Sequence, residues 1–227
     1  MRGLLSMFAF LVLVSVVPLC GCGTEATSDG SPSQSSPRAA RSPEKPGPLV
    51  IFLGDSLTAG YGLPAEESFP ALVVRLLEAE GRSVRIVNAG VSGDTTAGGL
   101  RRLDWLLPQK PAVLVVGLGG NDGLRGLSLR ETEENLRAIV VRAKASGVRV
   151  LLLGMRLPPN YGPDYTARFE RIYLAIARAE RVSLVPFLLE GVGGDPTLNL
   201  PDGIHPNRIG HERVAGNVFP VLRDLLH

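Results

Sequence analysis

Residues 112 to 122 read Ala112-Val113-Leu114-Val115-Val116-Gly117-Leu118-Gly119-Gly120-Asn121-Asp122. The first seven are apolar without alternation, which is typical of a strand that is covered on both faces of a sheet. The last four combine turn-forming glycines with side chains that form hydrogen bonds. This pattern predicts a central strand of a parallel sheet, with a polar loop at its carboxyl end.

The rest of the chain repeats this arrangement. Further short apolar runs occupy residues 49–53, 84–87, 148–153 and 182–185. Amphipathic segments follow the runs at residues 69–80, 95–107, 129–145, 165–180 and 209–226. Strands that alternate with helices indicate βαβ units joined by right-handed crossovers. We therefore expect residues 49–227 to form one α/β domain, a three-layer α/β/α structure with a flavodoxin-like parallel sheet of about five strands.

Each polar motif of this domain comes directly after a predicted strand or before the last helix. Ser56 follows the first strand, Gly93 the second and Asn121 the third, whereas Asp202 and His205 precede the last helix. The carboxyl ends of parallel strands meet at one edge of the sheet, where ligands bind. We expect these residues to meet at that edge.

Together these residue types fit nucleophilic catalysis. A serine hydroxyl such as that of Ser56 needs a base, and the base needs a partner that orients it. His205 and Asp202 lie three residues apart in a loop rich in proline and glycine, so they can form that pair. The backbone N–H groups of Ser56 and Gly93 and the amide of Asn121 could stabilise a developing oxyanion.

Each motif also has a simpler interpretation. Ser56 could be a turn or capping residue, the Gly-Gly-Asn-Asp run could be a tight turn, and Asp-x-x-His could cap a helix or supply half of a metal site. A metal site lacks further ligands, because only His211 lies nearby. One acyl-transfer mechanism uses all of the motifs, so we favour it and expect no metal and no cofactor.

The N-terminus resembles an export signal. Arg2 precedes an apolar run from Leu4 to Leu19, and the run ends in Leu19-Cys20-Gly21-Cys22. This ending resembles a bacterial lipobox, so we expect residues 1–21 to be a signal peptide and Cys22 to be lipidated. A cleaved secretory signal and an uncleaved membrane anchor are the alternatives. We accordingly expect the protein to be exported and held at the cell envelope, with the domain facing the periplasm or the cell exterior.

Residues 22–48 have the composition of a disordered tether, rich in Ser, Pro and Gly. Cleavage before Cys22 removes Arg2, which lowers the formal net charge from +2 by one. It also leaves a single cysteine, so no internal disulfide can form. A charge this close to neutral argues against nucleic acid as a partner. We expect a monomer that acts on small molecules.

The motifs in their order resemble a known family. Gly-Asp-Ser-Leu at 54–57, the lone Gly93, Gly-x-Asn-Asp at 119–122 and Asp-x-x-His at 202–205 are similar to the four blocks of the GDSL or SGNH hydrolases. The stretches 54–63, 88–95, 118–126, 156–162 and 202–207 resemble the branch of periplasmic thioesterases that are also described as lysophospholipases and arylesterases. The Gly-x-Ser-x-Gly elbow of α/β-hydrolases is absent.

The resemblance implies an SGNH-hydrolase fold and a role for each residue. Ser56 would be the nucleophile, His205 the base and Asp202 its orienting partner, with Ser56, Gly93 and Asn121 as the oxyanion hole. The substrate would be an acyl ester, a thioester or a lysolipid. Carbohydrate O-acetyl ester hydrolysis, and lipid binding by a lipoprotein without catalysis, remain the alternatives.

The resemblance also implies a substrate-binding region. A mobile loop over residues 123–128 would border the acyl site, with Gly123 and Gly126 suited to a hinge. Gly123 and Leu124 would bind the substrate. Leu157 would complete the apolar wall, although ordinary core packing explains that residue equally well. The N-terminus departs from the familiar members of this branch, which are soluble.

Overall fold

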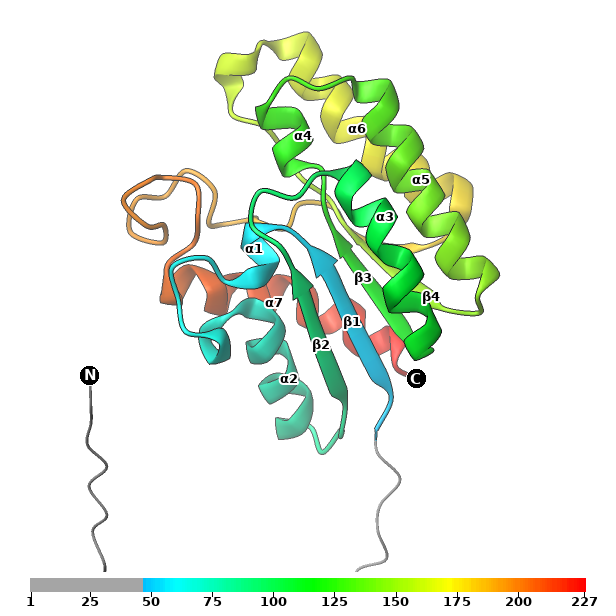
Figure 1. The fold of residues 1–227 in the computed structure, drawn as a ribbon. Helices are drawn as coiled ribbons and strands as arrows, with labels where there is room; N and C mark the ends of the chain where they lie inside the picture. Colours follow the sequence, from blue (N-terminus) through cyan, green and yellow to red (C-terminus); the bar gives the residue numbers. More distant parts are fainter. Residues whose placement is uncertain (1–46) are drawn as a thin grey trace, which may run out of the picture. The chain divides into compact units, whose positions relative to one another are not determined.

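The computed structural model describes residues 47–227, and its centre is a five-stranded parallel sheet (Figure 1). The strands are β1 (Leu49–Gly54), β2 (Arg85–Gly90), β3 (Val113–Gly117), β4 (Arg149–Leu153) and β5 (Ser183–Val185). Their order in the sheet is β2-β1-β3-β4-β5. The parallel sheet predicted from the sequence is confirmed.

The register of the sheet sets the position of the site. Gly54 at the end of β1 pairs with Gly90 of β2 on one side and with Gly117 of β3 on the other. These three strands therefore end at one level. The chain moves from β1 to one neighbour, β2, and later to the other, β3, so the order reverses beside β1. Open α/β sheets bind ligands outside the carboxyl ends of strands at such a reversal.

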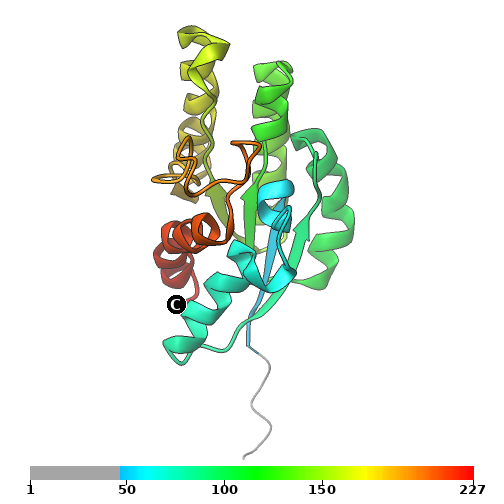
Figure 2. The same cartoon turned by 90° about the vertical axis from the view of Figure 1, so that its left-hand side faces the viewer.

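Helices cover both faces of the sheet. Helices α2 (Phe69–Ala79) and α7 (Arg208–Leu225) pack against each other on one face (Figures 1 and 2). Helices α3 (Thr96–Leu106), α5 (Leu129–Ala145) and α6 (Pro163–Glu180) form a row on the other face. The residues of β1 and β3 are all buried between these two layers. This arrangement is the expected three-layer structure.

Shorter elements fill the connections. Helix α1 (Ser56–Ala59) follows β1, and helix α4 (Gly120–Leu124) follows β3. Three 3₁₀ turns are formed by Ala65–Glu67, Leu107–Gln109 and Pro159–Tyr161. These elements are too short to show a helical period in the sequence, and the sequence did not predict them.

A buried histidine joins helix α7 to the start of helix α2. The Phe69 N–H donates to His211 Nδ1 at 3.1 Å. Ser68 precedes α2 but makes no side-chain capping bond, so the imidazole takes the capping role. Only 1% of His211 is exposed, and this burial lowers its pKa from the usual 6.5 to about 4. His211 is therefore a neutral structural residue, and its ring lies parallel to that of Phe69.

Both ends of the described chain lie at the amino edge of the sheet. Residues 47 and 48 lead directly into β1, and Arg149 at the start of β4 donates to the His227 carbonyl oxygen at 3.1 Å. The expected signal peptide, Cys22 and nearly all of the expected tether lie outside the described residues, so these predictions and the domain boundary at residue 48 stay predictions. Within residues 47–227 no helix has the length and apolarity to cross a bilayer.

Candidate active site

Ser56, His205 and Asp202 form a continuous line of hydrogen bonds at the carboxyl edge of the sheet. His205 Nε2 lies 2.9 Å from Ser56 Oγ, and His205 Nδ1 lies 2.7 Å from Asp202 Oδ2. Ser56 is the first residue of α1, whereas the other two come from the loop before α7. The structure thus brings together the three residues for which the sequence predicted catalytic contact.

The loop holds Asp202 as an anion. The backbone N–H groups of Ile204 and His205 donate to Asp202 Oδ1 at 2.9 and 3.0 Å. These two bonds, followed by the one from the His205 ring, lower the pKa of Asp202 to about 2. A β-bridge between Asn199 and Pro206 closes the loop. Asp202 therefore stays ionised at neutral pH and accepts a hydrogen bond from the Nδ1–H group of His205, which leaves Nε2 to face the serine.

The turn from β1 into α1 sets the position of Ser56. A Cβ on Gly54 would lie 1.9 Å from Thr58 Oγ1, so the turn requires a glycine at that position. Asp55 caps α1 by accepting from the Leu57 N–H at 3.0 Å. Asp55 is 4% exposed, and this burial raises its pKa to about 6 despite the opposing bond from Leu57. The Ser56 N–H opens the helix, so no carbonyl of an earlier turn accepts from it.

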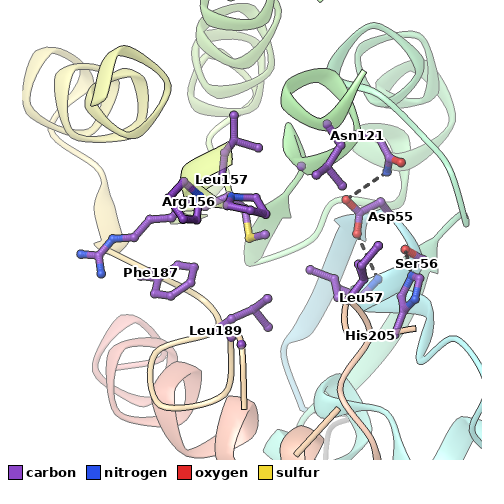
Figure 3. Close-up of a pocket in the computed structure, with 18 residues that line it drawn as sticks. Asp55, Ser56, Leu57, Asn121, Arg156, Leu157, Phe187, Leu189 and His205 are labelled. Carbon is purple, nitrogen blue, oxygen red and sulfur yellow. Dashed lines mark hydrogen bonds between the residues drawn. The ribbon is translucent and has the colours of Figure 1, made fainter. Parts of the chain in front are cut away.

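Gly93 follows β2 and Asn121 lies in α4 after β3, and these two strands flank β1. Gly93 has φ +78°, and its carbonyl oxygen accepts from Arg125 Nη2 at 2.9 Å. Its own N–H has no hydrogen-bond acceptor among the described residues. Asn121 Nδ2 donates to the Asp94 carbonyl oxygen at 3.0 Å and lies 3.4 Å from Asp55 Oδ2 (Figure 3). The bond to Asp94 fixes the amide plane. The contact with Asp55 is long, so the amide can exchange it for another acceptor.

Arg102 of α3 ties these loops to the strands. Its Nη1 donates to the Ala89 carbonyl oxygen at 2.5 Å, and its Nη2 donates to the Gly54 carbonyl oxygen at 3.1 Å. Its guanidinium also forms an ion pair with Asp94 Oδ2 at 2.5 Å. Arg102 therefore fixes the ends of β1 and β2 and the residue whose carbonyl holds Asn121. This role of Arg102 was not predicted from the sequence.

An apolar cavity of about 590 Å³ opens beside Ser56. In Figure 3, Ser56 and His205 lie at one end of it, and Arg156 and Phe187 lie at the other. The Arg156 guanidinium lies 4.8 Å from the centroid of the Phe187 ring. The apolar side chains that line the cavity include Leu57, Leu124, Met155, Leu157, Phe187, Leu189 and Ile204.

Of the three residues expected to bind the substrate, Leu124 and Leu157 line the cavity and Gly123 does not. Gly123 is buried within α4, and a Cβ there would lie 2.6 Å from Leu157 Cδ2 and 2.9 Å from Phe169 Cε2. The structure therefore places Gly123 behind the wall, where it allows close packing of Leu157. Phe187 and Leu189 were not predicted from the sequence, although both follow β5 as the other site residues follow their strands.

Among residues 47–227, no three His, Cys, Asp or Glu side chains gather in a way that could hold an ion. His211, the only candidate second histidine near Asp202 in the sequence, is occupied by the Phe69 N–H. The arrangement at Ser56 suits a reaction that needs a nucleophile, a base and N–H donors.

The fold and the site together define a class of protein. A nucleophilic serine at the end of the first strand, beside the reversal of a flavodoxin-like sheet, characterises serine hydrolases of a kind distinct from the α/β-hydrolases. Residues 52–213 match the model of the GDSL-like Lipase/Acylhydrolase family. The chain belongs to that family, as the four sequence blocks predicted.

Named relatives lie within the same family. The chain is 48% identical over 178 residues to Esterase TesA of Pseudomonas aeruginosa, covering 78% of this chain and 89% of that protein. It is 41% identical over 179 residues to Thioesterase 1/protease 1/lysophospholipase L1 of Escherichia coli, covering 78% of this chain and 85% of that protein. A crystal structure of the psychrotrophic esterase EstA from Pseudoalteromonas sp., inhibited by monoethylphosphonate, matches with a TM-score of 0.75, 33% identity and coverage of 79% and 98%.

Proposed function

We propose that this protein is a serine esterase and thioesterase that hydrolyses acyl esters or thioesters through an acyl-enzyme. The observation that carries the proposal is the line of hydrogen bonds from Ser56 Oγ through His205 to Asp202. The esterase and thioesterase names of relatives at 48% and 41% identity support the same reaction class.

The proposed reaction has two steps. Ser56 Oγ attacks the acyl carbonyl carbon while His205 Nε2 takes the hydroxyl proton. His205 then returns that proton to the departing alcohol or thiol, which leaves an acyl ester on Ser56. In the second step, His205 removes a proton from water, the water oxygen attacks the acyl carbon, and Ser56 regains its proton as the acid leaves. Asp202 balances the charge of the imidazolium in both steps.

The proposed oxyanion hole has three donors. The N–H groups of Ser56 and Gly93 provide two, and neither is used within the described fold. Asn121 provides the third by exchanging its long contact with Asp55 for a bond to the oxyanion, while its bond to Asp94 keeps the amide in place. Donors held in advance of the reaction stabilise the transition state at little cost in reorganisation.

The cavity favours an acyl chain as the bound group. Its volume of about 590 Å³ lies within the range of roughly 300–1,000 Å³ for small-molecule sites, and its walls are predominantly apolar. An acetyl group would leave most of that apolar surface in contact with water, so medium or long acyl chains are the preferred substrates. A carbohydrate O-acetyl esterase would instead show a strong preference for acetyl over decanoyl esters.

The test compares wild type with Ser56→Ala on p-nitrophenyl decanoate, p-nitrophenyl acetate and decanoyl-CoA. Wild type should hydrolyse both decanoyl substrates, and Ser56→Ala should lose all three activities while keeping its melting temperature. A fluorophosphonate probe should label wild type only, because it reacts with activated serines. Wild-type turnover by Ser56→Ala would refute the assignment, and an unlabelled, inactive wild type would favour lipid binding without catalysis.

We further propose that the enzyme is exported, lipidated on Cys22 and held at the cell envelope as a monomer. The support is the apolar run that ends in Leu19-Cys20-Gly21-Cys22. Cells that are fed a labelled fatty acid should incorporate it into wild type, and Cys22→Ala should abolish the incorporation. Label retained by Cys22→Ala would refute the lipobox. The mass of the purified domain in light scattering tests the monomer.

A further inference from the structure

Tyr61 contacts both Ser56 and His205, although it takes no part in the hydrogen bonds between them. It follows α1, and its backbone N–H donates to the Ser56 carbonyl oxygen at 3.0 Å. Its side-chain ring lies on the His205 imidazole, with the centroids 4.4 Å apart and an angle of 36° between the planes. Tyr61 is therefore tied to the nucleophile by its backbone and to the histidine by its ring.

The turn that delivers this ring depends on two glycines. Gly60 ends α1 in the left-handed region at φ +78°, and its N–H also donates to the Ser56 carbonyl oxygen, at 3.1 Å. Gly62 has φ +80°, and a Cβ there would lie 2.8 Å from Leu200 Cδ1. The Leu200 N–H in turn donates to the His205 carbonyl oxygen at 2.7 Å. The turn around Tyr61 thus packs directly on the loop that carries His205.

The ring contact reinforces the two hydrogen bonds of His205. Rotation of the imidazole about its Cβ–Cγ bond would carry both ring nitrogens away from Asp202 and Ser56. The contact of Tyr61 on the ring face opposes that rotation as well. It also acts on charge, because an aromatic face attracts a cation, and the imidazole becomes a cation when it takes the serine proton.

We propose that Tyr61 is a positioning residue, which holds the His205 ring in line with Ser56 Oγ and stabilises the imidazolium that forms during the reaction. This inference rests on the proposed function. Only the aromatic face is required, so Phe should replace Tyr61 and Leu should not. The other ionisable groups that act on the imidazole are Asp202 by direct contact and Asp55 and His211 through space.

The first experiment compares Tyr61→Leu and Tyr61→Phe with wild type on p-nitrophenyl decanoate. Tyr61→Leu should lower kcat about three- to thirtyfold, the effect of a cation–π contact, with KM within about twofold. Tyr61→Phe should restore kcat to within about twofold of wild type. Trp105→Leu, which removes an aromatic ring that is 79% exposed on α3, is the matched control and should behave as wild type.

The second readout is the pH dependence of kcat/KM, which a purely structural role would not move. Loss of the aromatic face makes the charged imidazole easier to deprotonate, so the acid limb should move about half a pH unit lower in Tyr61→Leu. It should stay in place in Tyr61→Phe.

Three results would overturn the inference. The first is a wild-type kcat in Tyr61→Leu. The second is a change in KM alone, which would indicate that Tyr61 contacts the substrate. The third is an equal loss of kcat in Tyr61→Phe, which would indicate a role for the hydroxyl group. Activity retained by Ser56→Ala would instead refute the proposed function itself, so the two failures are distinguishable.

Discussion

The buried imidazole of His211 predicts a specific loss of stability in acid. Its pKa is about 4 in the folded protein and 6.5 when exposed, so protonation favours the unfolded chain. The stability that the protein gains from keeping His211 neutral is fully present above pH 6.5, and it declines as the pH falls toward 4. At 1.36 kcal/mol per pKa unit, the two values give a loss of about 2 to 3 kcal/mol between pH 7.5 and 4.5.

The matched variant is His211→Asn. The Asn oxygen lies close to the position of Nδ1, so it can still accept from the Phe69 N–H, but it does not titrate. The smaller side chain lowers stability by an amount that does not depend on pH. The free energy of unfolding in urea is measured from pH 4.5 to 7.5 for both proteins.

The difference between the two curves isolates His211. The pKa of Asp55 is raised to about 6, so its burial is less costly in acid, but this effect is common to both proteins and cancels. Wild type should lose about 2 to 3 kcal/mol relative to His211→Asn over this range. Parallel curves, which differ by less than about 0.5 kcal/mol in their pH dependence, would refute the reasoning.

Three further predictions concern the site. Asn121→Ala should lower kcat about 10²- to 10³-fold as an oxyanion donor is lost, and a change below about twofold would remove Asn121 from the hole. Arg102→Met should lower the free energy of unfolding by on the order of 3 kcal/mol, because it leaves Asp94 unpaired, whereas Arg130→Met, at an exposed ion pair, should change it by less than about 1 kcal/mol. Phe187→Ala should enlarge the far end of the cavity and raise the ratio of kcat/KM for palmitoyl over octanoyl esters about tenfold. An unchanged ratio would show that the acyl chain does not bind in this cavity.

The centre of the fold was predictable because local patterns specify it. The run at residues 112–118 is apolar throughout because β3 lies in the middle of the sheet. Helix α5 has the bounds expected from the sequence, since Ser128 caps it and Gly147 follows its end. The edge strand β2 was predicted too short. Its last residues, Asn88 to Gly90, resemble a turn, but pairing with β1 keeps them extended.

The site residues were predictable only where a residue follows a strand or lies in a loop rich in proline and glycine. Ser56, Asn121 and His205 meet this condition, and the sheet brings them to one edge. Arg102 does not, because on an amphipathic helix it resembles an ordinary solvated charge, and only the folded chain shows that it binds two strand ends. Tyr61 likewise gives no signal in the sequence, since its partner His205 is distant along the chain.

The placement of residue 47 and His227 at the amino edge of the sheet has a practical consequence. Ser56 and the mouth of the cavity lie at the carboxyl edge, at the other end of β1. A bead, a resin or a fusion partner that is joined ahead of residue 47 or after His227 is therefore attached to the side that carries out no chemistry. An immobilised catalyst made in either way should keep its entrance open to bulk solution.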